Sequence, residues 1–197
     1  MPGVRAAPTQ SAWVARSDLG RDHPAKTTTI AYRDVLSQLW LLDPVEAWQP
    51  AGSELGRLSK APKHQLADPG LAARLLDLSE PEFEPGRRGA PLLGRFFDHL
   101  VTMSVQSYAI VSEARVRYFR APTGDRDVDV IVEARGRVVA IEVKLARTVD
   151  DHDVRHLLWL RERLGDRFAD GIVVTTGTHA YRRKDGIGVV PAALLGP

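Results

Sequence analysis

Two short hydrophobic stretches carry acidic and basic side chains at alternating positions. Asp127 and Asp129 lie in the first stretch, and Glu142 and Lys144 lie in the second. Acidic residues are poor strand formers, and strand side chains alternate between two faces, so each pair is expected to share one face. Carboxylates gathered on neighbouring strands are typical ligands of a hard divalent cation, and a lysine beside them suits phosphate chemistry.

The turn between the two stretches determines how they meet. If the loop lies within residues 134–137, antiparallel pairing places Asp129 opposite Glu142 and Asp127 opposite Lys144. Two carboxylates directly opposite each other repel. A protein tolerates this arrangement with a cation between them or with one of the carboxyl groups protonated.

Oxygen-only donors favour Mg²⁺ or Mn²⁺ over zinc. We therefore expect Asp129 and Glu142 to bind the metal ion, with Lys144 beside it. This arrangement suits metal-assisted hydrolysis of phosphodiesters. The alternative is a solvent-facing hairpin with a salt bridge between Asp127 and Lys144, which leaves the opposed carboxylates unexplained.

Hydrophobic periodicity indicates the elements that must position these residues. Residues 92–108 repeat apolar side chains in the manner of an amphipathic helix. Three extended stretches, a helix and two further strands follow. Their expected ranges are 115–120, 128–133, 138–145, 154–164, 171–176 and 188–190. The pattern predicts an α/β (α+β) domain over residues 92–197.

The preceding residues are expected to form a smaller unit. Residues 1–65 read as a tail, two helices and a strand over Val45–Trp48, an order that resembles part of a winged helix. Residues 53–69 read as irregular, and residues 66–91 as a connecting helix and loop. Such a segment either contacts DNA through residues 27–33 or packs against protein.

The order of motifs is similar to the PD-(D/E)XK nuclease core. Asp129 followed by Glu142, Val143 and Lys144, on a hairpin after an amphipathic helix, carries that resemblance. Over most of residues 20–197 the chain also resembles a domain of unknown function at the C-terminus of many predicted bacterial and archaeal AAA+ ATPases. The wider motifs are Leu93–Asp98, Arg120, Asp127–Asp129, Ile141–Lys144, His156–Leu160, Gly171–Gly177 and Val190–Pro191.

The resemblance implies a restriction-endonuclease-like mixed sheet flanked by helices. It assigns Asp129 and Glu142 as metal carboxylates, Lys144 as the catalytic lysine and Asp98 as the helix acid. That helix acid is usually Glu, and Asp98 is one methylene shorter. The implied function is a Mg²⁺- or Mn²⁺-dependent endonuclease acting on DNA. The alternative is a non-catalytic DNA-binding or protein-interaction module that regulates an AAA+ ATPase.

The composition of the chain narrows the classes of protein to which it could belong. The net charge is +2, with 27 basic and 25 acidic residues, which by itself does not argue for nucleic-acid binding. The absence of cysteine excludes disulfides and thiolate metal sites. No apolar run reaches the ~20 residues of a membrane span, and no secretory signal is visible, so a cytoplasmic protein without a membrane partner is expected. No Gly-x-x-x-x-Gly-Lys-[Ser/Thr] motif is present, so an ATPase would lie on another domain or chain.

Histidines offer weaker candidates. His152 and His156 lie four residues apart on the predicted helix over 154–164 and its approach, a spacing seen in metal pairs. With no third ligand evident, a surface pair is expected instead of a zinc site. His99 adjoins Asp98, but neighbours on a helix point about 100° apart, so we expect its position to be incidental.

Overall fold

The computed structural model describes residues 25–49, 61–121 and 123–196. The chain divides into two compact units, Met1–Leu42 and Asp43–Pro197. Among the described residues, the first unit contains helix α2 (Lys26–Gln38). The helix predicted before α2 lies outside the described residues, so the winged-helix-like segment and the domain limits at residues 65 and 91 stay predictions.

A small two-stranded sheet follows α2 and pairs β1 (Leu42–Val45) with β2 (Lys63–Leu66). The strand predicted over residues 45–48 therefore begins earlier, although Ala47 still forms a parallel bridge to Tyr118. The prediction of an irregular stretch over residues 53–69 was wrong at β2. Its first three residues are polar, so that strand carries no alternating hydrophobic signal.

The main sheet has six strands in the order β3-β4-β5-β6-β8-β7. The β5–β6 and β6–β8 pairs are parallel, and the other three pairs are antiparallel. The predicted α+β class with a mixed sheet flanked by helices is confirmed. The strands are β3 (Arg115–Arg120), β4 (Asp127–Ala134), β5 (Arg137–Lys144), β6 (Phe168–Thr175), β7 (Tyr181–Arg182) and β8 (Gly188–Pro191). The sequence did not reveal β7, which has only two residues.

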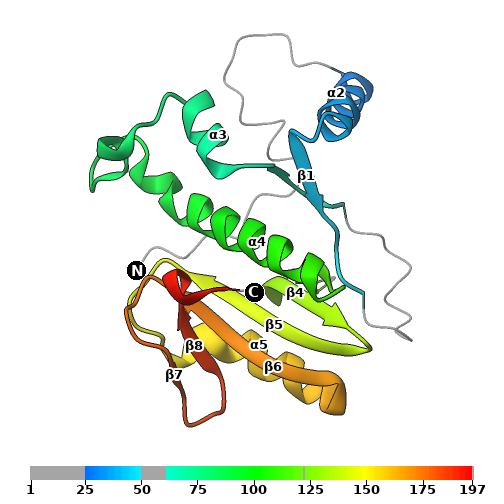
Figure 1. Cartoon of the computed structure of the whole chain (residues 1–197), viewed down its shortest axis with the longest axis vertical. Coiled ribbons are helices and arrows are strands. Elements are labelled where there is room, and N and C mark those ends of the chain that lie inside the picture. Colours follow the sequence, from blue (N-terminus) through cyan, green and yellow to red (C-terminus); the bar gives the residue numbers. More distant parts are fainter. Residues whose placement is uncertain (1–24, 50–60, 122, 197) are drawn as a thin grey trace. The chain divides into compact units, whose positions relative to one another are not determined.

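Helices α4 (Leu93–Val111) and α5 (Asp151–Leu164) cover opposite faces of this sheet (Figure 1). Each helix buries its apolar face against the strands and forms a separate core cluster. The α4 cluster includes Val101, Val105, Val130, Ile141 and Val174. The α5 cluster includes Val128, Ile131, Val138, Ala140, Val154, Leu157 and Leu160. The other helices of the described second unit are α3 (Pro69–Leu75) and 3-10 turns at Glu80–Phe83, Ala90–Leu92, Gly165–Arg167 and Ala192–Leu194.

The β4–β5 turn has the backbone that the hairpin register requires. Arg135 and Gly136, its two central residues, have φ angles of 50° and 75°. Positive φ at both central positions is the signature of a two-residue type I′ turn, whose twist matches the flanking strands. The ladder runs from this turn as far as Val130, which pairs with Ile141. The predicted register is confirmed over that span.

A bulge interrupts β4 where it passes β3. Arg117 pairs with Ile131, whereas Phe119 pairs with Val128, so two residues of β4 lie opposite one of β3. The extra residue falls at 129–130. A bulge bends its strand and re-aims the side chains that follow.

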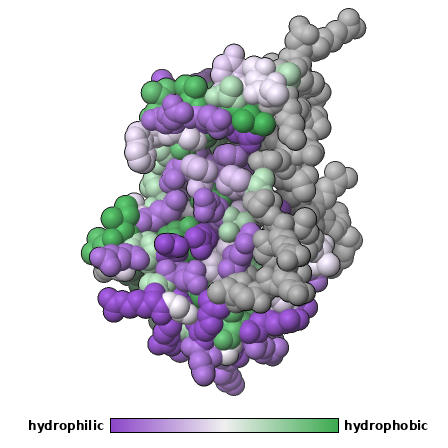
Figure 2. Space-filling view, turned by 90° about the vertical axis from the view of Figure 1, so that its right-hand side faces the viewer, coloured by the Kyte–Doolittle hydropathy of each residue, from purple (hydrophilic) through white to green (hydrophobic). Residues whose placement is uncertain are grey.

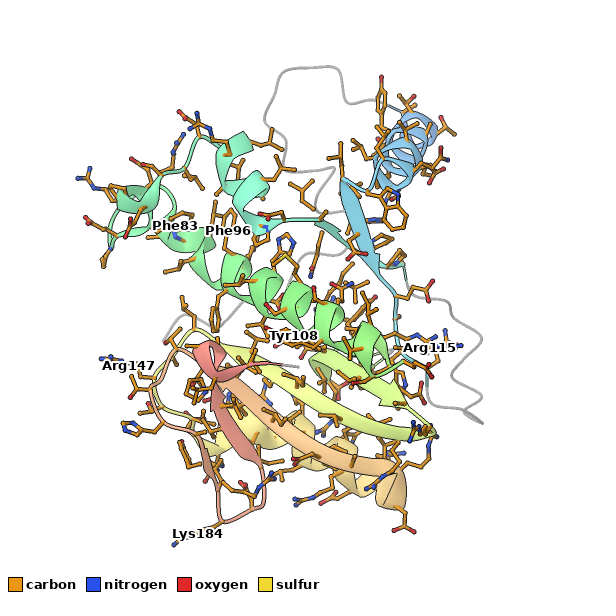
Figure 3. The ribbon with its side chains drawn as sticks, in the orientation of Figure 1. Phe83, Phe96, Tyr108, Arg115, Arg147 and Lys184 are labelled. Atoms are coloured by element: carbon orange, nitrogen blue, oxygen red, sulfur yellow. The ribbon has the colours of Figure 1, made fainter. Side chains whose placement is uncertain are left out.

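An aromatic contact fixes the start of α4. Phe83 and Phe96 meet edge to face, with ring centroids 5.3 Å apart, and join the 3-10 turn to the helix (Figure 3).

Figure 2 shows a face on which hydrophilic side chains predominate and hydrophobic groups form separate patches. Within the described residues, no helix has the length and apolar character needed to cross a membrane.

Candidate active site

The predicted site residues gather where β4 and β5 run together at the end away from their turn. Glu142 and Lys144 occupy the last positions of β5. Asp129 lies in β4 at the bulge, one step beyond the last backbone pair of the ladder. Its Oδ2 atom accepts a hydrogen bond from the backbone N–H of Val143 at 2.9 Å. A side-chain bond thus replaces the next backbone pair and fixes Asp129 against β5.

The bulge divides the acidic residues of β4 between two surroundings. Val128 packs in the α5 cluster and Val130 in the α4 cluster, although residues two apart share a face in a regular strand. The expectation that Asp127 and Asp129 share a face assumed such a regular strand and was wrong. Asp127 lies 3.3 Å from the Nδ1 atom of His156, on α5. Asp129 instead interacts electrostatically with Asp98, on α4.

Glu142 is the most buried member of the group, with a side chain only 10% exposed. Burial, and next the charge of Asp129, raises the pKa of Glu142 to about 8, while Lys144 opposes the shift. Its Oε1 atom lies 2.9 Å from Lys144 Nζ. Burial alone would lower the pKa of Lys144, but the Glu142 carboxylate raises it above its ordinary value, which keeps the lysine charged.

Asp98 approaches the group from α4. Burial raises the pKa of Asp98 to about 6, with Asp129 adding to the shift and Lys63 opposing it. Lys63 belongs to β2, and its Nζ atom lies 5.1 Å from the ring centroid of Tyr118. Sequence reasoning included Lys63 in the family resemblance but gave it no place at the site, because only the tertiary fold brings it near Asp98.

Two carboxylate oxygens in this group lack partners. Asp98 Oδ1 and Glu142 Oε2 are buried and accept no hydrogen bond within the described part of the chain. Buried polar atoms are nearly always paired, so two orphans beside a third carboxylate indicate a group that completes them. Oxygen-only donors with raised pKa values fit a hard divalent cation, because the cation offsets the repulsion among the carboxylates.

The ligand atoms of Asp98, Asp129 and Glu142 nevertheless do not all lie within 4.8 Å of one another. Among the described residues, the group of acids and histidines whose ligand atoms all lie within 4.8 Å of one another is Asp150, His152 and Asp153. Asp150 and Asp153 also form a capping box at the start of α5, each accepting a backbone N–H at 3.0 Å. That hydrogen bonding accounts for their approach without an ion.

The Asp127–Lys144 salt bridge expected for the alternative, a solvent-facing hairpin, does not form. Asp127 pairs with Arg120 at 3.9 Å and with His156, and Lys144 pairs with Glu142 and Asp153. His156 also corrects the surface-pair expectation, because it is only 8% exposed. Its burial could not be read from the four-residue spacing.

His99, by contrast, has a structural partner. Its Nε2 atom lies 2.6 Å from the carbonyl oxygen of Leu66, which joins α4 to β2. Burial lowers the pKa of His99. That its position beside Asp98 is incidental stays a prediction.

Comparisons with known proteins place these residues in a family context. The domain of unknown function DUF4143 matches residues 93–195, just over half of the 197 residues and all of the carboxylate group. A second domain of unknown function, DUF8612, matches residues 6–82. The comparison with curated proteins gave no match.

Among solved structures, the chain is similar to one in a tetradecameric assembly of Thermococcus gammatolerans McrB AAA+ hexamers with bound McrC. The identity is 12% and the TM-score is 0.37, over 96% of this chain and 67% of the other.

Proposed function

We propose that this chain, which belongs to the DUF4143 family through residues 93–195, is a metal-dependent nuclease that hydrolyses DNA phosphodiesters. The observation that carries the proposal is the pair of buried, unpartnered oxygens of Asp98 and Glu142 beside Asp129 and Lys144. In this proposal the mixed sheet is a restriction-endonuclease-like core, and the bulge in β4 serves to aim Asp129.

In this proposal Asp129 and Glu142 hold Mg²⁺ or Mn²⁺, and Asp98 is a secondary acid. A bound divalent ion supplies a water of lowered pKa and offsets charge on the phosphate. Asp129 is already fixed by the Val143 N–H, so little conformational freedom is lost when it binds. Glu142 gives up its proton on binding, because an adjacent cation favours the ionised carboxylate.

Lys144 has the charge and position for the second part of the chemistry. Its ammonium lies against Glu142 Oε1 and 3.9 Å from Asp153 Oδ1, so three donors are held beside the carboxylates. We assign it to orienting the attacking water or donating to a phosphate oxygen as negative charge develops. Lys63 adds a second positive charge on the α4 side.

DNA is the proposed substrate, and an AAA+ ATPase is the proposed partner. The substrate follows from the chemistry of the site, which combines carboxylates for a metal ion with a lysine for a phosphate oxygen. The partner follows from the resemblance of residues 20–197 to a domain found with such ATPases. The non-catalytic module is the competing function, and the following experiment separates the two.

The test is cleavage of supercoiled and linear DNA with Mg²⁺ or Mn²⁺ by the wild-type chain, Asp129→Ala and Lys144→Ala. We expect nicking by the wild type and about 10²-fold or greater loss in both variants, the scale of removing a charge-stabilising group. His152→Ala is the matched control, since His152 is exposed and outside the proposed site. Cleavage that is equal in all four proteins, or absent in all, contradicts the enzyme and favours the regulatory module.

A further inference from the structure

His156 links α5 to the strand that carries the proposed site. Its Nδ1 atom lies 2.7 Å from the carbonyl oxygen of Asp127, and its Nε2 atom lies 2.9 Å from Arg155 Nε. The Nε atom of arginine always carries a hydrogen, so His156 Nε2 must accept. The ring proton therefore lies on Nδ1 and is donated to Asp127.

This bridge lies beside the carboxylate group. Asp127 is the first residue of β4 and precedes Asp129 by two positions. Its charge is one of those that raise the pKa of Glu142. The imidazole is buried and its two hydrogen bonds are partly buried, so they restrain both partners.

Arg155 is exposed but not free to turn. Its Nε atom is engaged by His156, and no described residue accepts a hydrogen bond from its two terminal nitrogens. Two further guanidinium groups contact neighbours of this bridge. Arg126 lies 5.1 Å from the ring centroid of Trp159, and Arg120 lies 3.9 Å from Asp127. Arg155 and Arg126 both act on the pKa of His156, which burial lowers first and which these two charges lower further.

We propose that Arg155, positioned by His156, binds a backbone phosphate of DNA next to the phosphate that is cleaved. The inference rests on the proposed function, because it places a neighbouring phosphate of the same substrate. An exposed guanidinium whose two terminal nitrogens have no partner among the described residues can donate to two phosphate oxygens at once. Fixing it in advance reduces the conformational entropy lost on binding. Arg155 is thus a binding residue, and His156 is a positioning residue.

The test is duplex DNA binding by fluorescence anisotropy in EDTA, repeated over a range of salt concentrations. Arg155→Gln should weaken binding several-fold and reduce the slope of log K against log salt by about 0.9, the value for one phosphate contact. Arg135→Gln is the matched control, because it removes one arginine charge at the β4–β5 turn. That turn lies at the other end of the sheet, the end marked by Arg115 in Figure 3. The control should leave the slope unchanged.

His156→Asn separates positioning from folding. Asparagine can still donate to the Asp127 carbonyl but does not reach Arg155, so we expect weaker DNA binding by a chain whose circular dichroism shows that it is still folded. An unchanged salt slope in Arg155→Gln overturns the phosphate contact, and so does a wild-type chain that does not bind DNA. Normal DNA affinity in His156→Asn overturns the positioning role.

The binding measurement is independent of cleavage. If the wild-type chain cleaves DNA but Arg155→Gln leaves the salt slope unchanged, the proposed nuclease stands and this inference fails. If the wild-type chain does not cleave DNA but Arg155→Gln reduces the salt slope, the phosphate contact stands and the proposed nuclease fails.

Discussion

At the residue scale, the proposed site is built from carboxylates that the fold places at an electrostatic cost. Glu142 and Asp98 are each more easily protonated in the folded chain than in the unfolded one, because burial and Asp129 raise their pKa values to about 8 and about 6. A metal-free site therefore sheds negative charge by retaining protons. The residues of the proposed site therefore lower stability at neutral pH, a trade that is common where residues serve function.

The pH dependence of stability follows with a definite sign. A carboxyl group whose folded pKa lies above its unfolded value stabilises the fold fully below the unfolded pKa, and this contribution is lost as pH rises through the folded pKa. For Glu142 the window runs from 4.5 to about 8. We expect the free energy of unfolding of the metal-free chain to fall by roughly 2–4 kcal/mol between pH 5 and pH 8. Denaturant unfolding in EDTA at several pH values measures this fall.

Glu142→Gln is the matched variant for that measurement. The amide cannot ionise, so most of the fall should disappear, and the variant should be more stable than the wild type at pH 8. Only the smaller contribution of Asp98 should remain. Parallel pH profiles for the two proteins would show that Glu142 does not carry a raised pKa.

Local sequence patterns pick out the residues proposed for the site, but they do not show the surroundings of those residues. Asp129, Glu142 and Lys144 follow from alternation and register, both of which are local. The surroundings of Lys63 and His156 could not be predicted, because their interactions with Asp98 and Asp127 join elements far apart in the chain. The four-residue spacing of His152 and His156 does not show which of the two is buried, and Lys63 lies in a stretch that reads as irregular.

At the element scale, the β4–β5 hairpin shows where local rules hold and where they fail. The turn at Arg135 and Gly136 predicts the register correctly as far as Val130. The bulge at 129–130 arises from pairing with β3, and nothing in the residues of β4 marks it. Strands of six to eight residues were predictable from hydrophobic runs, whereas the polar β2 and the two-residue β7 were not.

The start of α5 gives a second prediction at this scale. Asp150 caps the helix, and its partner in the capping box, Asp153, lies 3.9 Å from Lys144. Asp150→Ala should lower the free energy of unfolding by about 1 kcal/mol, the usual value of an N-cap. Denaturant unfolding measures the change. Glu162→Ala, an exposed change later in the same helix, should stay within about 0.5 kcal/mol of the wild type. Equal effects of the two substitutions would argue against the cap.

At the scale of the whole molecule, one sheet joins two cores. The α4 and α5 clusters lie on opposite faces and share the same central strands, so loss of either core should unfold the domain as a unit. Leu157 is fully buried in the α5 cluster. Leu157→Ala should cost about 2–5 kcal/mol, through lost transfer energy and the cavity left behind. Calorimetry should show a lower melting temperature in one transition for residues 43–197, and a separate early transition would contradict the shared sheet.

Overall organisation was only partly predictable from the sequence. The order and type of most elements from residue 92 onward follow from hydrophobic periodicity. Each of these elements buries a hydrophobic face that is long enough to give a recognisable pattern in the sequence. Across residues 1–91 such faces are short, and the described strands there are set by pairing partners more than by their own composition. The mixed sheet was therefore predictable, and the two-stranded sheet was not.

The central claim is that Asp129 and Glu142 form a divalent cation site, and Mn²⁺ titration by calorimetry tests it most directly. At pH 8 we predict one Mn²⁺ bound by the wild-type chain and no measurable binding by Asp129→Asn or Glu142→Gln. His152→Ala, which removes a ligand from the competing cluster at the start of α5, should bind as the wild type does. Binding that survives in Asp129→Asn and Glu142→Gln but disappears in His152→Ala would contradict the account.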